Sequence, residues 1–334
     1  MPQGQLAQVL RGVIGEADER LLVGPTTVDD AGVVALGPAA GFAELHDLAL
    51  VQTVDYFPPV VDDPYYYGAI AAANSLSDVY AMGGRPYTAL NLAGFPKDFP
   101  SDWMHEIFRG GFDKVKESGA VVAGGHTVQS AEVQFGFSVT GFVDRKSISA
   151  NAGAQVGDVL YITKPLGMGT MTTAAKRGKV AWAEMEPAAI QMATLNARAA
   201  EAMTACGAHA ATDITGFGLA GHGKNIAAAS GVTLRFETAE LPIFPGALEL
   251  ARAGFMSGGA ARGQAALAGE VVTADGLDET LAKLVFDAET SGGLLIVVAE
   301  DRAAILEREL EARGQLVRVV GRVVERGAAW VEFA

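Results

Sequence analysis

The 334-residue sequence has a single cysteine, Cys206, and no long apolar run. One cysteine excludes a disulfide framework and a Cys-x-x-Cys metal site, and it is typical of a cytoplasmic protein. No apolar stretch reaches the roughly 20 residues that a membrane-spanning helix requires. The first residues, Met1 to Gly4, lack the basic start and apolar core of a signal peptide. We therefore expect a cytoplasmic protein that does not contact a membrane.

Basic residues are also scarce. The chain has 25 Lys and Arg against 39 Asp and Glu, a formal net charge of −14 and a pI near 4.8. Neutralising the phosphates of nucleic acid requires clustered basic side chains, so nucleic acid is excluded as an expected partner. An acidic protein that binds a phosphate ligand needs metal ions or backbone amides to offset the repulsion.

Length and composition predict a well-buried globular protein of two domains, since half of the residues are hydrophobic and only 19% are charged. A polar, glycine-rich stretch, residues 151–158, separates two halves in which helical and strand-like segments alternate. We therefore expect an α/β fold with an N-terminal domain at residues 1–155 and a C-terminal domain at residues 156–334.

Hydrophobic periodicity predicts the individual elements. One segment, residues 119–127, is interpreted as a buried strand that runs into a glycine turn. The expected helices are residues 5–15, 66–82, 101–117 and 187–206. The other expected strands include residues 48–57, 87–95, 133–143, 232–237, 289–300 and 317–325, and residues 159–169 are interpreted as a strand that ends in a glycine-rich turn.

Four aspartates stand beside apolar strands or glycine-rich segments: Asp30 in VDDAGVV, Asp55 in VQTVDYF, Asp78 in ANSLSDVYAMGG and Asp213 in TDITGFG. Carboxylates are rarely buried without partners. One interpretation is that each caps a helix or closes a turn. The other is that they converge on Mg²⁺, a hard ion that binds carboxylate and phosphate oxygens together. Four such aspartates favour the second interpretation.

Other motifs carry less information. Gly124-Gly125-His126-Thr127 offers backbone amides and a hydroxyl to an anion, or it is only a tight turn. No P-loop and no strand-anchored Gly-x-Gly-x-x-Gly motif is present. His222 stands near Asp213 but is weak as a candidate metal ligand, and Cys206 is interpreted as a small buried hydrophobe.

Taken in order, several segments resemble selenophosphate synthetase (selenide, water dikinase). They are VDD, QTVDYFPPVVDDPYYYGAIAAANSLSDVYAMGGRP, VVAGGHT, TKPLGMG, TDITGFGLAGH and DAETSGGLL, and they cover the chain from about Leu21 to its end. The wider superfamily, which includes aminoimidazole ribonucleotide synthetase, thiamine-monophosphate kinase and a hydrogenase maturation factor, shares the acidic positions but not the whole series.

The resemblance implies an aminoimidazole ribonucleotide synthetase-like fold whose N-terminal strands form a barrel across a homodimer. It also implies a reaction in which ATP, selenide and water give selenophosphate, AMP and orthophosphate. By motif, the resemblance assigns the following positions: Mg²⁺ ligands at Asp30, Asp78 and Asp213; nucleotide contacts at Thr27, Val28, Asp29, Asp55 and Asp78; and contacts from the partner subunit at Gly125, His126 and Thr127.

The sequence departs from the family pattern in two places. In the tail motif, Ala288 and Glu289 replace a proline and a glutamine, and the GGTxxN motif appears as GGAARG at residues 258–263. In addition, the family's N-terminal cysteine or selenocysteine nucleophile and its following lysine have no counterpart here, so no catalytic residue is assigned. Either the sequence begins after that segment, as when a selenocysteine codon is taken for a stop, or the chain is a paralogue that binds ATP without making selenophosphate.

Two rival functions follow from the sequence. One is another ATP-using member of the superfamily, similar to thiamine-phosphate kinase or the hydrogenase maturation factor, and product analysis separates it because only the dikinase reaction gives AMP and orthophosphate. The other is a non-catalytic ATP-binding subunit, which would bind ATP without turnover.

Overall fold

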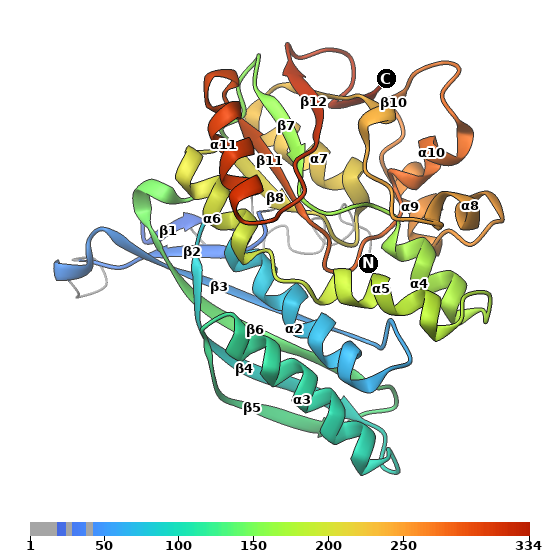
Figure 1. The fold of residues 1–334 in the computed structure, drawn as a ribbon. Coiled ribbons are helices and arrows are strands. Elements are labelled where there is room, and N and C mark those ends of the chain that lie inside the picture. The colour runs from blue at the N-terminus through green and yellow to red at the C-terminus, as the bar shows by residue number, and fades with distance from the viewer. Residues whose placement is uncertain (1–18, 25–28, 38–42) are drawn as a thin grey trace.

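The computed structural model describes residues 19–24, 29–37 and 43–334. Its first half is a six-stranded sheet in the order β1-β2-β3-β6-β4-β5, covered on one face by two helices (Figure 1). All neighbouring strands are antiparallel except β4 and β5. The elements are β1 (Leu21–Val23), β2 (Gly32–Ala35), β3 (Leu48–Phe57), α2 (Pro64–Ala81), β4 (Arg85–Phe95), α3 (Ser101–Glu117), β5 (Val121–Gln129) and β6 (Gln134–Asp144).

The second half is a seven-stranded sheet in the order β10-β13-β9-β12-β7-β11-β8, with helices around it. Its strands are β7 (Val159–Ile162), β8 (Ala210–Asp213), β9 (Thr233–Phe236), β10 (Val271–Thr273), β11 (Leu294–Val298), β12 (Val319–Val324) and β13 (Val331–Phe333). Its helices are α4 (Met168–Lys176), α5 (Trp182–Ala193), α6 (Ala197–Cys206), α7 (Gly218–Ser230), α8 (Ala247–Arg252), α9 (Gly258–Ala266), α10 (Glu279–Leu284) and α11 (Glu300–Ala312).

Helix α2 connects the two halves. Asp63 caps its N-terminus by accepting a hydrogen bond from the backbone N–H of Tyr66, and Pro64 occupies the first turn, where no N–H is needed. The helix is buried along nearly its whole length, because it packs against α3 and the first sheet on one side and against α5, α6 and β8 on the other. One hydrophobic core therefore continues from the first half into the second.

Small residues allow α2 and α3 to approach closely. A Cβ atom on Gly68 would lie 1.9 Å from the carbonyl oxygen of Ile107, and one on Gly110 would lie 1.9 Å from that of Tyr65. Any side chain at either position would separate the two helices.

The predicted α/β fold is confirmed, and several elements lie where the periodicity places them, among them α2 and α3. The predicted helix over residues 187–206 is wrong in one respect: it is two helices, α5 and α6, separated at Thr194–Asn196. The side chain of Asn196 is turned inward there and donates to Ser77 and to the carbonyl of Gly292. Tertiary hydrogen bonds thus interrupt a sequence of good helical periodicity.

The expectation for residues 119–127 is also wrong. Strand β5 continues through the two glycines to Gln129, and it is an exposed edge strand rather than a buried one. It pairs only with β4, so its other edge has no strand partner among the described residues. The expected helix over residues 5–15 lies outside the described residues, and the expected domain boundary stays a prediction.

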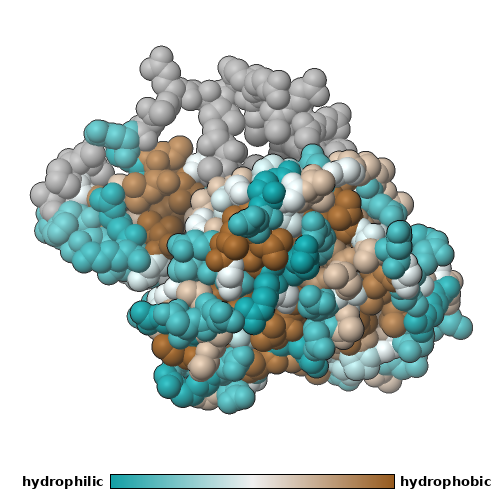
Figure 2. All heavy atoms as spheres, turned by 90° about the horizontal axis from the view of Figure 1, so that it is seen from above, coloured by the Kyte–Doolittle hydropathy of each residue, from teal (hydrophilic) through white to brown (hydrophobic). Residues whose placement is uncertain are grey.

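The outer surface is mixed in character. Seen from above, hydrophilic residues surround apolar patches (Figure 2), as is usual for a globular protein. In the part of the chain that the structure describes, no helix has the length and apolarity needed to cross a membrane.

Candidate functional site

The four aspartates singled out in the sequence come from four different parts of the fold. Asp30 precedes β2, Asp55 lies near the end of β3, Asp78 is in the last turn of α2 and Asp213 ends β8. Asp78 and Asp213 are buried, with 7% and 1% of their surface exposed. None of the four caps a helix N-terminus, so the capping interpretation does not explain them.

Electrostatics show that these carboxylates are close neighbours. Burial, followed by repulsion from Asp55, Asp213 and Asp30, raises the pKa of Asp78 well above its usual value. Burial and then repulsion from Asp213 likewise raise the pKa of Asp30, and they raise that of Asp55 to about 7. Burial raises the pKa of Asp213 to about 6, although the Ser77 hydroxyl and Lys164 oppose the shift. The tertiary fold therefore gathers all four into what we call the aspartate cluster.

Neighbouring donors orient the aspartate cluster. Thr212 Oγ1 donates to Asp30 Oδ1 at 2.7 Å, and the Thr53 hydroxyl donates to Asp78 Oδ2. Asn74 Nδ2 donates to Asp55 Oδ2 at 2.7 Å. Each of these three carboxylates thus has one oxygen held by a side chain of the protein.

Other oxygens of the aspartate cluster have no partner. Oδ2 of Asp30 and Oδ2 of Asp213 are both buried, and neither makes a hydrogen bond to a described residue. Buried carboxylate oxygens without donors are costly, and a hard divalent cation would satisfy them while relieving the mutual repulsion. The chemistry of the residues therefore fits Mg²⁺.

The aspartate cluster is not a closed cage. Among the described residues, no three His, Cys, Asp or Glu side chains are gathered closely enough to enclose one ion. Such spacing suits Mg²⁺ bound by one or two carboxylates, with the rest of its coordination supplied by water and substrate phosphates. His222 is not available as a ligand, since Thr212 and Thr215 contact its two ring nitrogens.

The residues predicted to contact the nucleotide differ in where they lie in the structure. Thr27 and Val28 lie outside the described residues. Asp29 Oδ1 accepts a hydrogen bond of 2.6 Å from the backbone N–H of Asn151, so its side chain ties the start of β2 to the segment between the two sheets. Its predicted contact with a nucleotide stays a prediction.

Gly125, His126 and Thr127 lie on β5, away from the aspartate cluster. In the order β3-β6-β4-β5, strand β5 is three positions from the strand that carries Asp55, a separation of about 14 Å at the usual strand spacing. The backbone at Gly125 is crowded, because a Cβ atom there would lie 2.3 Å from the carbonyl oxygen of Asn91. Within one chain, this segment does not join the aspartate cluster.

Sequence reasoning missed several residues that support the aspartate cluster. Asn74 and Thr212 stand beside quoted aspartates, and their hydrogen bonds to Asp55 and Asp30 could have been anticipated only with the fold known. Lys164 is part of the quoted TKPLGMG segment, but its ammonium is buried and faces two backbone carbonyls. The TKPLGMG motif is the sequence signal that points to this lysine.

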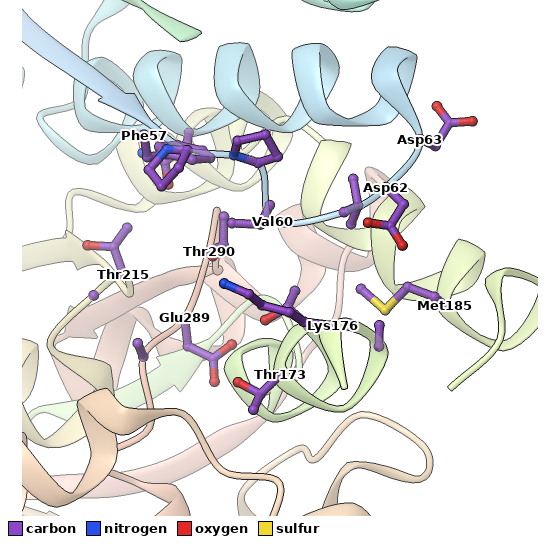
Figure 3. A pocket seen from close by; sticks show the side chains of 18 of the residues that line it. Phe57, Val60, Asp62, Asp63, Thr173, Lys176, Met185, Thr215, Glu289 and Thr290 are labelled. Carbon is purple, nitrogen blue, oxygen red and sulfur yellow. The ribbon is translucent and has the colours of Figure 1, made fainter. Parts of the chain in front are cut away.

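A cavity of about 900 Å³ opens beside Asp55 and Asn74, between elements of the two halves. Figure 3 shows Lys176 of α4 extending into it, with Thr290 nearby and Asp62 at the rim. Lys176 makes no ion pair with any described residue. The lining of the cavity combines apolar side chains with hydroxyl groups and includes Phe57, Pro58, Pro59, Val60, Trp182, Thr172, Thr173, Thr215 and Glu289.

Glu289, one of the departures from the family pattern, has a defined role. Its two carboxyl oxygens accept hydrogen bonds from the backbone N–H groups of Gly167 and Met168, at 2.6 and 2.9 Å, at the start of α4. Burial raises its pKa to about 8, despite these two bonds. Cys206 agrees with its sequence interpretation: it is buried, and burial raises its pKa to about 11, so the reactive thiolate is disfavoured.

Comparison with protein families matches both halves of the chain. Residues 28–143 match the N-terminal domain of AIR synthase related proteins, and residues 155–332 match the C-terminal domain. Curated proteins named selenide, water dikinase are also similar. The chain is 47% identical to that of Caldanaerobacter subterraneus subsp. tengcongensis over 96% of its own length and 91% of the relative's, and 42% identical to that of Clostridioides difficile over 94% and 88%.

Solved structures share the fold at lower identity. The protein tt0281 from Thermus thermophilus superimposes with a TM-score of 0.74 at 22% identity, covering 99% of this chain and 96% of the other. AaThiL complexed with AMPPCP and TMP gives 0.70 at 19% identity, covering 98% and 92%. Hydrogenase maturation protein HypE in complex with ATP gives 0.65 at 18% identity, covering 100% and 92%. These likenesses support the fold.

Proposed function

Because the chain belongs to the selenide, water dikinase family of AIR synthase-related proteins, we propose that its aspartate cluster holds Mg²⁺ and ATP for the synthesis of selenophosphate. Selenide and water are the other reactants, and AMP and orthophosphate are the other products. The observation that carries the proposal is the gathering of four mutually repelling carboxylates, two of them buried, with two buried oxygens left without donors. An acidic site of this kind binds a polyphosphate only through cations.

The residues divide into two groups in this proposal. Asp30, Asp78 and Asp213 share Mg²⁺ ions between them, with one or two carboxylates to each ion, and the bound ions would supply positive charge to the phosphate oxygens. Asp55 and Asp29, with Thr27 and Val28, line the nucleotide. Phosphoryl transfer asks mainly for positioning and charge stabilisation, and the chain's own contribution is to fix carboxylates through Thr212, Thr53 and Asn74.

A second copy of the chain completes the site in this proposal. The face of the first sheet opposite α2 and α3 exposes apolar side chains, among them Val54, Tyr56, Tyr87 and Leu90. Such a face favours burial against another protein surface. A homodimer formed there would cover the apolar side chains, and it would let Gly125, His126 and Thr127 of one copy contact the nucleotide of the other.

Selenide and water would reach the phosphates of ATP through the cavity beside Asp55. Its position next to Asn74 and Thr290, at the junction of the two halves, supports this assignment. Lys176 offers an unpaired positive charge to the anions that enter and leave. We place the reaction in the cytoplasm, in agreement with the lone buried cysteine.

The test is a product analysis with the full gene product, ATP, selenide and Mg²⁺. We expect AMP and orthophosphate in equal amounts together with selenophosphate, and no product when Mg²⁺ is chelated. Asp78→Asn should abolish the reaction, whereas Asp301→Asn, on the exposed start of α11, should leave it unchanged. ADP as the main product would instead favour a kinase of the thiamine-phosphate type.

A further inference from the structure

Lys164 is a buried cation that the proposed binding of Mg²⁺ and ATP does not use. It follows β7, is 4% exposed, and donates from Nζ to the carbonyl oxygens of Thr194 at 2.7 Å and Ser291 at 2.8 Å. It makes no ion pair with a described carboxylate. A buried ammonium is costly. The charge of Asp213 offsets part of this cost, and the two carbonyl contacts fix where the ammonium lies.

One of its two acceptors, Ser291, has an unusual backbone. Among the described residues, Ser291 alone combines a side chain with a positive φ, of 50°. The two glycines that follow it are tightly packed: a Cβ atom on Gly292 would lie 2.2 Å from the carbonyl oxygen of Ile214, and one on Gly293 would lie 2.4 Å from the backbone nitrogen of Lys164. The left-handed conformation of a serine is strained and persists only where its surroundings hold it.

The strained residue leads directly to the aspartate cluster. The backbone N–H of Ser291 donates to Asn74 Oδ1 at 3.0 Å, and Asn74 Nδ2 donates to Asp55 Oδ2 at 2.7 Å. The amide orientation of Asn74 is fixed, because a backbone N–H can only donate and a carboxylate can only accept. A continuous path therefore runs from Lys164 in the second half to Asp55 in the first.

We propose that Lys164 is a positioning residue for the nucleotide site. By holding the carbonyl of Ser291, its ammonium keeps that residue in the left-handed conformation, which points the N–H at Asn74 and so fixes the carboxylate of Asp55. This inference rests on the proposed function, in which Asp55 lines the nucleotide. Its consequence is that the packing of the second half against α2 sets the orientation of a carboxylate in the first.

The experiment measures the affinity of the full chain for the ATP analogue AMPPCP in the presence of Mg²⁺. Lys164→Met and Asn74→Ala should each weaken binding by roughly tenfold, within the range of couplings carried by packed networks. Both residues act on Asp55 through one path. The affinity of the double variant for AMPPCP should therefore equal that of whichever single variant binds AMPPCP more weakly. If the loss of affinity in the double variant equals the product of the two single losses, Lys164 and Asn74 act independently and the proposal is overturned.

Two further variants separate positioning from stability. Thr163→Ala removes a hydrogen bond to the backbone N–H of Leu294, just beyond Ser291, and should lower the melting temperature while leaving the affinity unchanged. Ser291→Gly accepts the left-handed conformation without strain, so adding it to Lys164→Met should restore most of the lost affinity. A rescue that fails, or Lys164 variants that bind as tightly as the wild type, would refute the role of Lys164.

The folding of the Lys164 variants and the binding of AMPPCP by the wild type also test the proposed role of Lys164. If both Lys164→Met and the milder Lys164→Gln fail to fold, Lys164 is a structural residue and the proposal is wrong. If the wild-type chain itself does not bind AMPPCP with Mg²⁺, the proposed function fails and this inference fails with it. Wild-type binding with unchanged Lys164 variants would refute this inference alone.

Discussion

Removing the charge of Asp55 should change how the stability of the metal-free protein depends on pH. The pKa of Asp55 is about 7 in the folded protein, mainly because of burial, against 3.8 for an ordinary aspartate. Between these two values the folded state binds more protons than the unfolded state. The stability contributed by this group therefore falls as the pH rises from about 4 to about 7, and the cost is fully present above that window.

The size of the effect follows from the two pKa values. A difference of about three, at 1.36 kcal/mol for each, corresponds to at most about 4 kcal/mol of destabilisation at pH 8. Asp55→Asn removes the charge but keeps an oxygen that can accept from Asn74. The metal-free variant should thus become more stable than the wild type at pH 8, and the advantage should shrink towards pH 5.

Melting temperatures of both proteins, measured with a chelator at pH 5 and pH 8, test this reasoning. The difference between variant and wild type should grow by about 4 °C or more between the two pH values, at roughly 2 °C for each kcal/mol. Taking the difference cancels groups that do not interact with Asp55, such as His222, whose pKa burial lowers to about 4 and whose contribution has the opposite sign. The repulsion that Asp55 exerts on Asp78 is also removed in the variant, and its loss adds to the effect in the same direction. A difference that is constant within about 1 °C would show that Asp55 carries no buried charge.

Magnesium provides a second arm of the same experiment. A cation bound to the ionised aspartate cluster competes with protons, so adding Mg²⁺ should stabilise the wild type more at pH 8 than at pH 5. Equal stabilisation at both values would contradict the assignment of Mg²⁺ to this cluster.

Three other predictions concern single side chains. Thr212→Val removes the donor to Asp30 and should raise the Mg²⁺ concentration needed for half-maximal activity by about tenfold, as expected for a lost hydrogen bond to a charged group, while Thr212→Ser should not. Cys206→Ala should leave activity unchanged, and the native protein should resist thiol reagents, because the thiol is buried and its pKa is raised. Gly68→Ala, whose Cβ atom would lie 1.9 Å from the backbone of α3, should cost at least about 2 kcal/mol of unfolding free energy in denaturant titration, whereas Gly216→Ala meets open space and should cost less than about 1 kcal/mol.

Helix α3 and the aspartates show how far local sequence reaches. The bounds of α3 follow from its periodicity, because its apolar face and its polar face are written into neighbouring residues. The four aspartates could likewise be selected as a group, since an acid beside an apolar strand is unusual wherever the strand lies. In both cases the residues that form the pattern lie within a few positions of one another in the sequence.

Strand β5 and the break before α6 show where such reasoning stops. The composition of residues 119–127 suits a buried strand, but its place at the edge of the sheet is decided by the pairing of β4 with β5 and β6. The interruption at Asn196 depends on Ser77 and Gly292, which are about one hundred residues away along the chain in either direction. A periodic pattern carries no information about either.

The sequence by itself determined that this protein is an acidic α/β protein with a set of unusual aspartates, because composition and periodicity are local properties. Only the tertiary structure decided that those aspartates lie close together and that Thr212 and Asn74 donate hydrogen bonds to two of them. It also decided that Lys164 contacts the carbonyl of Ser291 nearby. The physical reason is that burial, repulsion and hydrogen bonding act between atoms a few ångströms apart, and the fold alone brings residues from β3, α2 and β8 to that distance.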